Sequence, residues 1–239
     1  MRIPGLVLSG ALAVVHLAPP CPASAQTSPP PHARSHRLLD VGDAAAAGVI
    51  LVATMAADKG LREEIQEHRD PQSNSVADVG NAFGEPRYVV PALGAAYLAG
   101  ELAGTRALRR LAVRAGGAAL VASGITGVLK YTFGRSRPSE GDADWFRPFS
   151  GQTSFPSGHT TVAFALATVV ADETRDDWSD VGVYGLATLT AFARLNDDRH
   201  WTSDVVLGAL IGHLSARWLS RRQGAIAVGP GFLGMALEF

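Results

Sequence analysis

The sequence contains one cysteine in 239 residues, Cys21, which lies close to the N-terminus. A single thiol cannot form a disulfide framework, and it cannot supply a cysteine-based zinc site. The charge is nearly balanced as well, with 21 Lys and Arg against 22 Asp and Glu and a formal net charge of −1. Such a chain has no global basic field to attract nucleic acid. These absences argue against disulfide-stabilised, thiolate-metal and nucleic-acid-binding proteins.

Aromatic residues are also scarce, at 7% of the chain, whereas hydrophobic residues make up 47% and glycines number 26. A composition rich in Ala, Val, Leu and Gly favours closely packed helices over a β-sandwich. The length is suited to about one domain. We therefore predict an all-α fold, in which six apolar stretches form a helical bundle: 41–57, 88–103, 111–131, 160–171, 181–195 and 203–219.

Long apolar runs are missing, because each of these stretches is shorter or more interrupted than the about 20 residues that span a bilayer. The helices could pack as a water-soluble bundle, or they could form short, tilted spans. Two groups of charged residues are predicted to be solvated. Residues 58–69 place Leu61 and Ile65 among charges, as in an amphipathic surface helix. Four aspartates are predicted to be loop charges: Asp142, Asp144, Asp197 and Asp198.

The two ends of the chain differ in composition from the predicted bundle. A basic start, an apolar stretch and Ala23-Ser24-Ala25 are typical of a cleaved signal peptide over residues 1–25. Residues 26–37 are Pro-rich and predict an extended linker. The helical domain then covers residues 38–222, and the tail 223–239 alternates Gly with apolar residues in the manner of an extended strand.

The distribution of charge predicts the side of a membrane on which the chemistry lies. If the helices run up and down in order, the ends of 111–131 and 181–195 meet the starts of 160–171 and 203–219. The opposite ends carry arginines that the positive-inside rule places in the cytoplasm: Arg106, Arg109, Arg110, Arg114, Arg221 and Arg222. A cleaved signal peptide followed by six spans would reverse this sense, so either 41–57 does not span or the bundle lies outside the inner membrane. Both cases predict a bacterial cell-envelope protein whose site faces the periplasm, either integral to the membrane or soluble.

The first candidate motif is Lys130-Tyr-Thr-Phe-Gly-Arg-Ser-Arg137-Pro138, at the end of an apolar stretch. Seven residues are about two helical turns, so Lys130 and Arg137 could project from one helix face toward one anion. Pro138 would end the helix just beyond them. Basic residues that merely flank an apolar helix would give the same pattern.

The second motif is Ser154-Phe-Pro-Ser-Gly-His-Thr160, followed by an apolar helical run. Ser157 suits the N-cap position, and Gly158 lets backbone N–H groups approach a ligand closely. The positive end of the following helix favours an anion such as phosphate. His159 at the same end could exchange a proton near neutral pH. A plain capping turn with an exposed histidine is the alternative.

The third motif contains Arg194, His200 and Asp204. His200 and Asp204 are four residues apart, so on a helix their side chains would meet. A carboxylate on one imidazole nitrogen fixes the tautomer and raises the basicity of the other, which prepares a nucleophile. Arg194 offers a planar fork of donors that matches phosphate oxygens. An ordinary surface His–Asp pair is the alternative.

Together the patterns K-x6-R-P, P-S-G-H and R-x5-H-x3-D, from Lys130 to Asp204, resemble the type 2 phosphatidic acid phosphatase (PAP2) and vanadium haloperoxidase superfamily. The resemblance implies an α-helical bundle and a phosphate pocket that needs no metal or cofactor. It implies that phosphate oxygens are bound by five residues: Lys130, Arg137, Ser157, Gly158 and Arg194. It also implies that His200 attacks phosphorus, that Asp204 orients it, and that His159 protonates the leaving oxygen and then activates water. The sequence departs from the family at Ala193, where a serine is usual.

The resemblance predicts a phosphatase that acts on a lipid-linked or small phosphomonoester, or on a pyrophosphate, and that is associated with a membrane. Phosphoryl transfer depends mainly on positioning and on charges around the phosphate, which these residues provide. A vanadate-dependent haloperoxidase is one alternative, because vanadate fits the same type of pocket. A non-catalytic envelope protein that binds lipid phosphates is another. Aromatic residues in 145–149 could line an acyl or prenyl chain, and His213 is predicted to be packed rather than catalytic.

Overall fold

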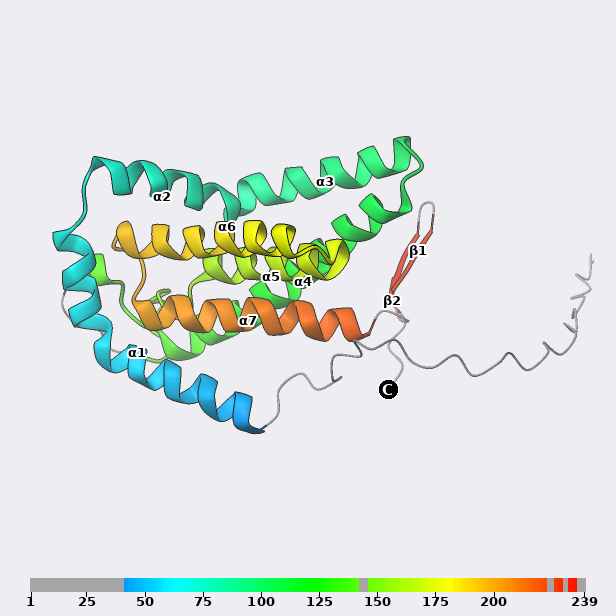
Figure 1. Ribbon diagram of the computed structural model, residues 1–239. Coiled ribbons are helices and arrows are strands. Elements are labelled where there is room, and N and C mark those ends of the chain that lie inside the picture. Colours follow the sequence, from blue (N-terminus) through cyan, green and yellow to red (C-terminus); the bar gives the residue numbers. More distant parts are fainter. Residues whose placement is uncertain (1–40, 142–145, 223–225, 230–231, 236–239) are drawn as a thin grey trace, which may run out of the picture. The chain divides into compact units, whose positions relative to one another are not determined.

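The computed structural model describes residues 41–141, 146–222, 226–229 and 232–235, and these residues confirm the all-α fold (Figure 1). They form seven α-helices and one short 3-10 helix. The α-helices are α1 (Val41–Glu67), α2 (Pro71–Phe83), α3 (Pro86–Leu102), α4 (Arg106–Phe133), α5 (Gly158–Thr174), α6 (Asp177–Asn196) and α7 (Thr202–Arg221). The 3-10 helix η1 covers Pro138–Glu140. Strands β1 (Ile226–Gly229) and β2 (Phe232–Met235) pair antiparallel in the tail. The predicted signal peptide and linker lie outside the described residues.

The structure has one more helix than predicted, because α2 occupies a polar stretch that lacks an apolar face of sufficient length. Its start is nonetheless encoded locally. Asp70 is the N-cap and accepts a hydrogen bond from the Ser73 N–H at 2.7 Å, while Pro71 takes the first helical position. The predicted stretches 41–57 and 58–69 also merge into the single helix α1.

Helix α5 is the centre of the bundle, in contact with α4, α6 and α7 (Figure 1). Its buried residues are mainly Ala, Val and Thr. Small side chains allow the helix axes to approach closely, so backbone atoms of neighbouring helices come near each other. Helix α7 makes the closest approach. The site described below lies where α5 and α7 begin.

Gly212 is the point of this approach, since a Cβ atom there would overlap the carbonyl oxygen of Thr161. We predict that Gly212→Ala destabilises the fold by about 1–3 kcal/mol, because backbone must shift to admit one methyl group. Gly182→Ala is the matched control, since no atom lies within 4 Å of its Cβ position. That change should stabilise α6 by up to about 1 kcal/mol through helix propensity. Chemical unfolding of both variants measures the difference, and equal effects would contradict the packing argument.

The second half of α1 is exposed on one face, as predicted, with Glu63, Glu64 and Glu67 at the surface, but its other face packs on the bundle. Asp58 is 1% exposed. Arg62 pairs with Asp198 through Nε–Oδ1 and Nη2–Oδ2 distances of 2.7 and 2.8 Å. Gln66 donates to the carbonyl oxygen of Leu195 at 3.0 Å. These contacts tie α1 to the α6–α7 connection and to the start of α7.

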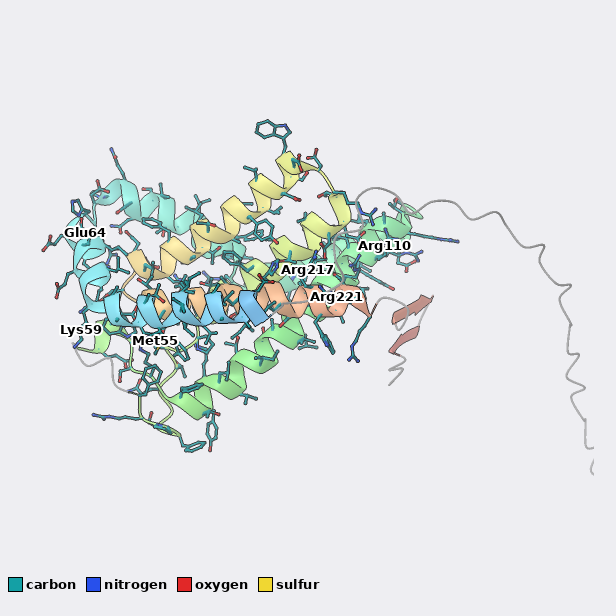
Figure 2. The ribbon with its side chains drawn as sticks, turned by 60° about the horizontal axis from the view of Figure 1, so that its bottom comes forward. Met55, Lys59, Glu64, Arg110, Arg217 and Arg221 are labelled. Atoms are coloured by element: carbon teal, nitrogen blue, oxygen red, sulfur yellow. The ribbon has the colours of Figure 1, made fainter. Side chains whose placement is uncertain are left out.

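In Figure 2, α1 lies in front of α7, which it contacts, and the two ends of the bundle are seen apart. Lys59 and Glu64 lie at one end, whereas Arg110, Arg217 and Arg221 lie at the other. The arginine-rich end is thus opposite the start of α7, as the up-and-down prediction required. Two helices are long and apolar enough to cross a membrane by length and composition, Gly42–Glu67 and Arg106–Phe133. Both helices are longer than the apolar stretches seen in the sequence, because they continue into charged residues at one end.

Candidate functional site

The three predicted motifs meet at one end of the bundle. The Ser157 N–H donates to the Asp204 carbonyl oxygen at 2.9 Å, which joins the start of α5 to the start of α7. Lys130, near the end of α4, donates from Nζ to the carbonyl oxygens of Thr153 and Ser154. Its Cε atom lies 3.9 Å from the Cβ position of Gly158. Residues far apart in the sequence therefore surround one small region.

The structure places Lys130 and Arg137 close together, but not on a common helix face as predicted. Helix α4 ends at Phe133, and Gly134 follows in the left-handed conformation with a φ of 56°. A side chain with Cβ disfavours this conformation, so the glycine ends the helix before Arg137. Arg137 Nη2 donates to Thr153 Oγ1 at 3.3 Å. Both basic side chains thus reach Thr153, one from the helix and one from the segment after it.

The second motif forms the start of α5, which begins at Gly158. Ser157 occupies the N-cap position, as predicted, but its hydroxyl makes no capping bond and instead lies 3.0 Å from Thr160 Oγ1. Ser157 is fully buried and the end of the helix is left with uncapped N–H groups. This arrangement is suited to binding an anion.

His200 and Asp204 are in contact, although His200 precedes α7 and does not share a helix with Asp204. The distance from His200 Nδ1 to Asp204 Oδ2 is 3.4 Å. The same oxygen accepts from the Trp201 N–H at 2.9 Å and from Ser154 Oγ at 2.5 Å. Asp204 is the third residue of α7, so its carboxylate also satisfies the start of that helix.

The environment of His200 favours its neutral form. The residue is 6% exposed, and burial lowers its pKa to about 4, although Asp204 opposes this shift. The positive charges of Lys130 and Arg137 lower the pKa further. At pH 7 the ring is therefore unprotonated at one nitrogen. Because Nδ1 faces the carboxylate, Nε2 carries the lone pair when Nδ1 is the protonated nitrogen.

Arg135 is a residue that the sequence analysis missed. It is 1% exposed, and its two terminal nitrogens lie 2.8 Å from Asp204 Oδ1 and 2.8 Å from Asp58 Oδ2. Ser203 completes the cluster, because its Oγ accepts from Arg135 at 2.7 Å and donates to Asp58 at 2.5 Å. A buried arginine between two buried carboxylates thus connects α1 to the group behind His200.

Helix α2 supplies another unpredicted contact, this time to Arg194. Arg194 Nη2 donates to Asn81 Oδ1 and to Asp197 Oδ2, the latter at 2.7 Å. Asn81 also donates to Asp197 at 2.9 Å. The Nε atom of Arg194 is buried, and no hydrogen-bond partner for it exists among the described residues. Arg194 is therefore held in place by α2 and by the residue that follows α6.

The prediction of solvated loop aspartates was wrong for Asp197 and Asp198, because each is paired with an arginine, Arg194 and Arg62 respectively. The other two lie outside the described residues. His213 is packed, as predicted, with Nδ1 3.1 Å from Thr168 Oγ1.

Glu85, between α2 and α3, lies beside the third candidate catalytic residue. Its Oε2 atom is 3.1 Å from His159 Nε2. Burial lowers the pKa of His159, and Glu85 opposes this shift. The hydrogen bond from His159 in turn lowers the pKa of Glu85. His159 therefore has a carboxylate partner, as His200 has in Asp204.

Aromatic residues gather near the end of α4. Tyr131 and Phe149 are both 63% exposed and pack edge to face with ring centroids 5.2 Å apart. Phe146 packs against Phe133 and Phe155 in the same manner. A rim that contacts an acyl or prenyl chain stays a prediction, and Trp145 lies outside the described residues.

Three comparisons with known proteins each found similar proteins. Residues 111–226 match the profile of the PAP2 superfamily. A lipid A 1-phosphatase from Porphyromonas gingivalis is 39% identical over 102 residues, which are 41% of this chain and 21% of that protein. This chain therefore matches only a minor part of that relative's length.

Two solved structures share the fold. Aquifex aeolicus LpxE superposes with a TM-score of 0.58 at 22% identity, over 69% of this chain and 94% of LpxE. A transmembrane PAP2-type phosphatidylglycerolphosphate phosphatase from Bacillus subtilis gives a TM-score of 0.56 at 16% identity, over 77% and 96% of the two chains.

Proposed function

Because this chain belongs to the PAP2 superfamily, we propose that it is a metal-independent phosphatase that hydrolyses lipid-linked phosphomonoesters through a phosphohistidine at His200. One observation carries the proposal above the others. A buried histidine, backed by Asp204, lies among the basic residues Lys130 and Arg137. A neutral nucleophile surrounded by cations is suited to attack on a phosphate dianion.

The binding of phosphate would use the donors already described. Lys130, Arg137 and Arg194 would neutralise the phosphate oxygens, and at the start of α5 the Ser157 hydroxyl and the Gly158 N–H would add hydrogen bonds. These charges do the work that a bound metal ion does in other phosphatases. Mutual repulsion of the cations is relieved when the dianion binds. We therefore expect activity in the presence of a chelator.

The reaction would proceed in two steps. His200 Nε2 forms a bond to phosphorus while the bond to the leaving oxygen breaks, and Asp204 stabilises the positive charge on the ring. His159 gives a proton to the leaving oxygen. Water then attacks phosphorus, the neutral His159 takes a proton from it, and His200 leaves. The enzyme returns to its starting state with one phosphate released.

A lipid substrate is favoured by two features. The relative with the matching segment is a lipid A 1-phosphatase. The exposed aromatic pair Tyr131 and Phe149 lies at the end of α4, close to the site, where the amphipathic ring of Tyr131 suits a membrane interface. Exposed apolar side chains on the two candidate spans, such as Val52 in α1 and Val128 in α4, would contact lipid. We propose an envelope protein with its site at the periplasmic surface.

Trapping the intermediate tests this function. Wild-type protein in detergent is mixed with phosphatidate labelled in the phosphate, quenched in alkali, and mapped by peptide digestion. We expect acid-labile label on the peptide that contains His200, and phosphate release that persists in EDTA. The same preparation is assayed for vanadate-dependent bromide oxidation. Bromide oxidation without phosphate release would instead show a haloperoxidase, and substrate binding without label would show a non-catalytic protein.

A further inference from the structure

The turn between α2 and α3 packs tightly against the site. A Cβ atom on Gly84 would lie 2.5 Å from the carbonyl oxygen of His159 and 2.8 Å from Thr190 Cγ2. Thr190 Oγ1 also donates to the Gly80 carbonyl oxygen at 2.7 Å. Because Gly84 has no side chain, its backbone can approach the backbone of His159 closely. The turn has little freedom to move relative to the start of α5.

Glu85 is the next residue along this turn. It is the N-cap of α3, yet its side chain makes no capping bond. The carboxylate instead reaches His159 Nε2 at 3.1 Å, and both side chains are more than half buried. The carboxylate of Glu85 is therefore directed toward His159, while Arg87 of its own helix also lowers its pKa.

We propose that Glu85 is a positioning residue that orients His159 and stabilises its protonated form for transfer of a proton to the leaving oxygen. This inference rests on the proposed function. Glu85 accepts a hydrogen bond from Nε2, so Nδ1 is the nitrogen that delivers the proton. As the bond from His200 to phosphorus forms and the ester P–O bond breaks, that proton moves to the leaving alcohol. In the second step the same nitrogen takes a proton from water.

The charges around His159 explain why such a partner is needed. Burial disfavours the protonated ring, and Arg194 from α6 and Lys130 from α4 add positive charge. Glu85 from the start of α3 supplies the opposing negative charge. Arg87 in turn lowers the pKa of Glu85 and so keeps it ionised. Without the carboxylate, every remaining influence removes the proton. The cations that bind phosphate would therefore favour the deprotonated form of His159, which has no proton to give to the leaving oxygen.

Glu85→Gln tests the proposal, because it keeps an acceptor but removes the charge. The matched control is Glu101→Gln at the other end of α3, where Glu101 pairs with Arg109 at 2.8 Å. Two substrates are compared. Benzyl phosphate releases an alcohol that needs a proton, whereas p-nitrophenyl phosphate releases a stable anion. For Glu85→Gln we expect kcat on benzyl phosphate to fall about 10-fold, with p-nitrophenyl phosphate changed less than about twofold.

The pH profile gives a second measurement. Loss of the carboxylate lets His159 release its proton more easily, so the alkaline limb of kcat/KM for benzyl phosphate should move to lower pH by about one unit. Glu85→Asp, which retains the charge, should keep most of the wild-type limb. Glu101→Gln should match the wild type for both substrates.

Three results would overturn the proposal while the wild type remains active. One is an equal loss on both substrates, which indicates a structural role. Another is a profile identical to that of Glu101→Gln. The third is increased activity in Glu85→Gln, which would mean that the carboxylate competes with substrate. A wild type that releases no phosphate from phosphatidate or from either ester would instead disprove the proposed function.

Discussion

Replacement of His200 by alanine is expected to lower kcat/KM by at least about 1000-fold, because the covalent route through a phosphorylated enzyme is lost. The donors around the phosphate remain, so substrate should still bind. A fall in kcat with little change in KM would therefore identify the nucleophile. Phosphate release from phosphatidate in detergent micelles measures both constants.

His68→Ala is the control for this change, since His68 is an exposed histidine of α1 whose ring is 74% accessible. It should retain wild-type activity. Unfolding midpoints of both variants show whether either change alters the fold. Substantial turnover by folded His200→Ala would exclude His200 as the nucleophile.

Arg135→Met should have the largest effect on stability, about 3–5 kcal/mol, because it leaves Asp58 and Asp204 as buried carboxylates without their cation. The methionine replaces most of the volume, so the loss reports on charge rather than on a cavity. Urea unfolding of the purified protein gives the difference in free energy. Activity should fall as well, since Asp204 loses one of the groups that fix its position.

Arg110→Met is the control, because Arg110 pairs with Glu173 while its own side chain is 61% exposed. Exposed pairs contribute about 0–1 kcal/mol. The double variant Asp58→Asn with Arg135→Met should be less unstable than additivity requires, because one of the two unpaired charges is gone. Arg135→Met as stable as Arg110→Met would show that the buried cluster contributes little.

The meeting of the three motifs was predictable from the sequence, whereas the catalytic roles of their residues stay predictions. His200, His159, Asp204 and the cations Lys130 and Arg194 stood out because together they match the motifs of a known family. Their proximity followed from the order of the helices alone. The local geometry was less predictable, since the spacing argument assumed helix at Arg137 and at His200, where the chain is not helical.

The partners of these residues could not be predicted. Asp58, Asn81 and Glu85 precede their partners Arg135, Arg194 and His159 by more than 70 residues in the sequence. No periodicity connects such distant positions. Glu85 looked like one charge in a turn, and Asp58 like part of a solvated helix. Arg135 lies within the first motif, in which only Lys130 and Arg137 were considered as phosphate ligands.

The close approach at Gly84 joins the start of α5 to a turn that lies outside the segment matching the family profile. Residues 111–226, the segment that matches the family profile, contain every residue predicted for the site. They do not contain the turn that carries Gly84 and Glu85, or the helix that carries Asp58. A chimera that replaced the first three helices would keep every motif residue, yet it would lose the carboxylates beside His159 and Arg135 unless the new helices supplied them. The interchangeable unit of this protein is therefore larger than the segment that identifies it.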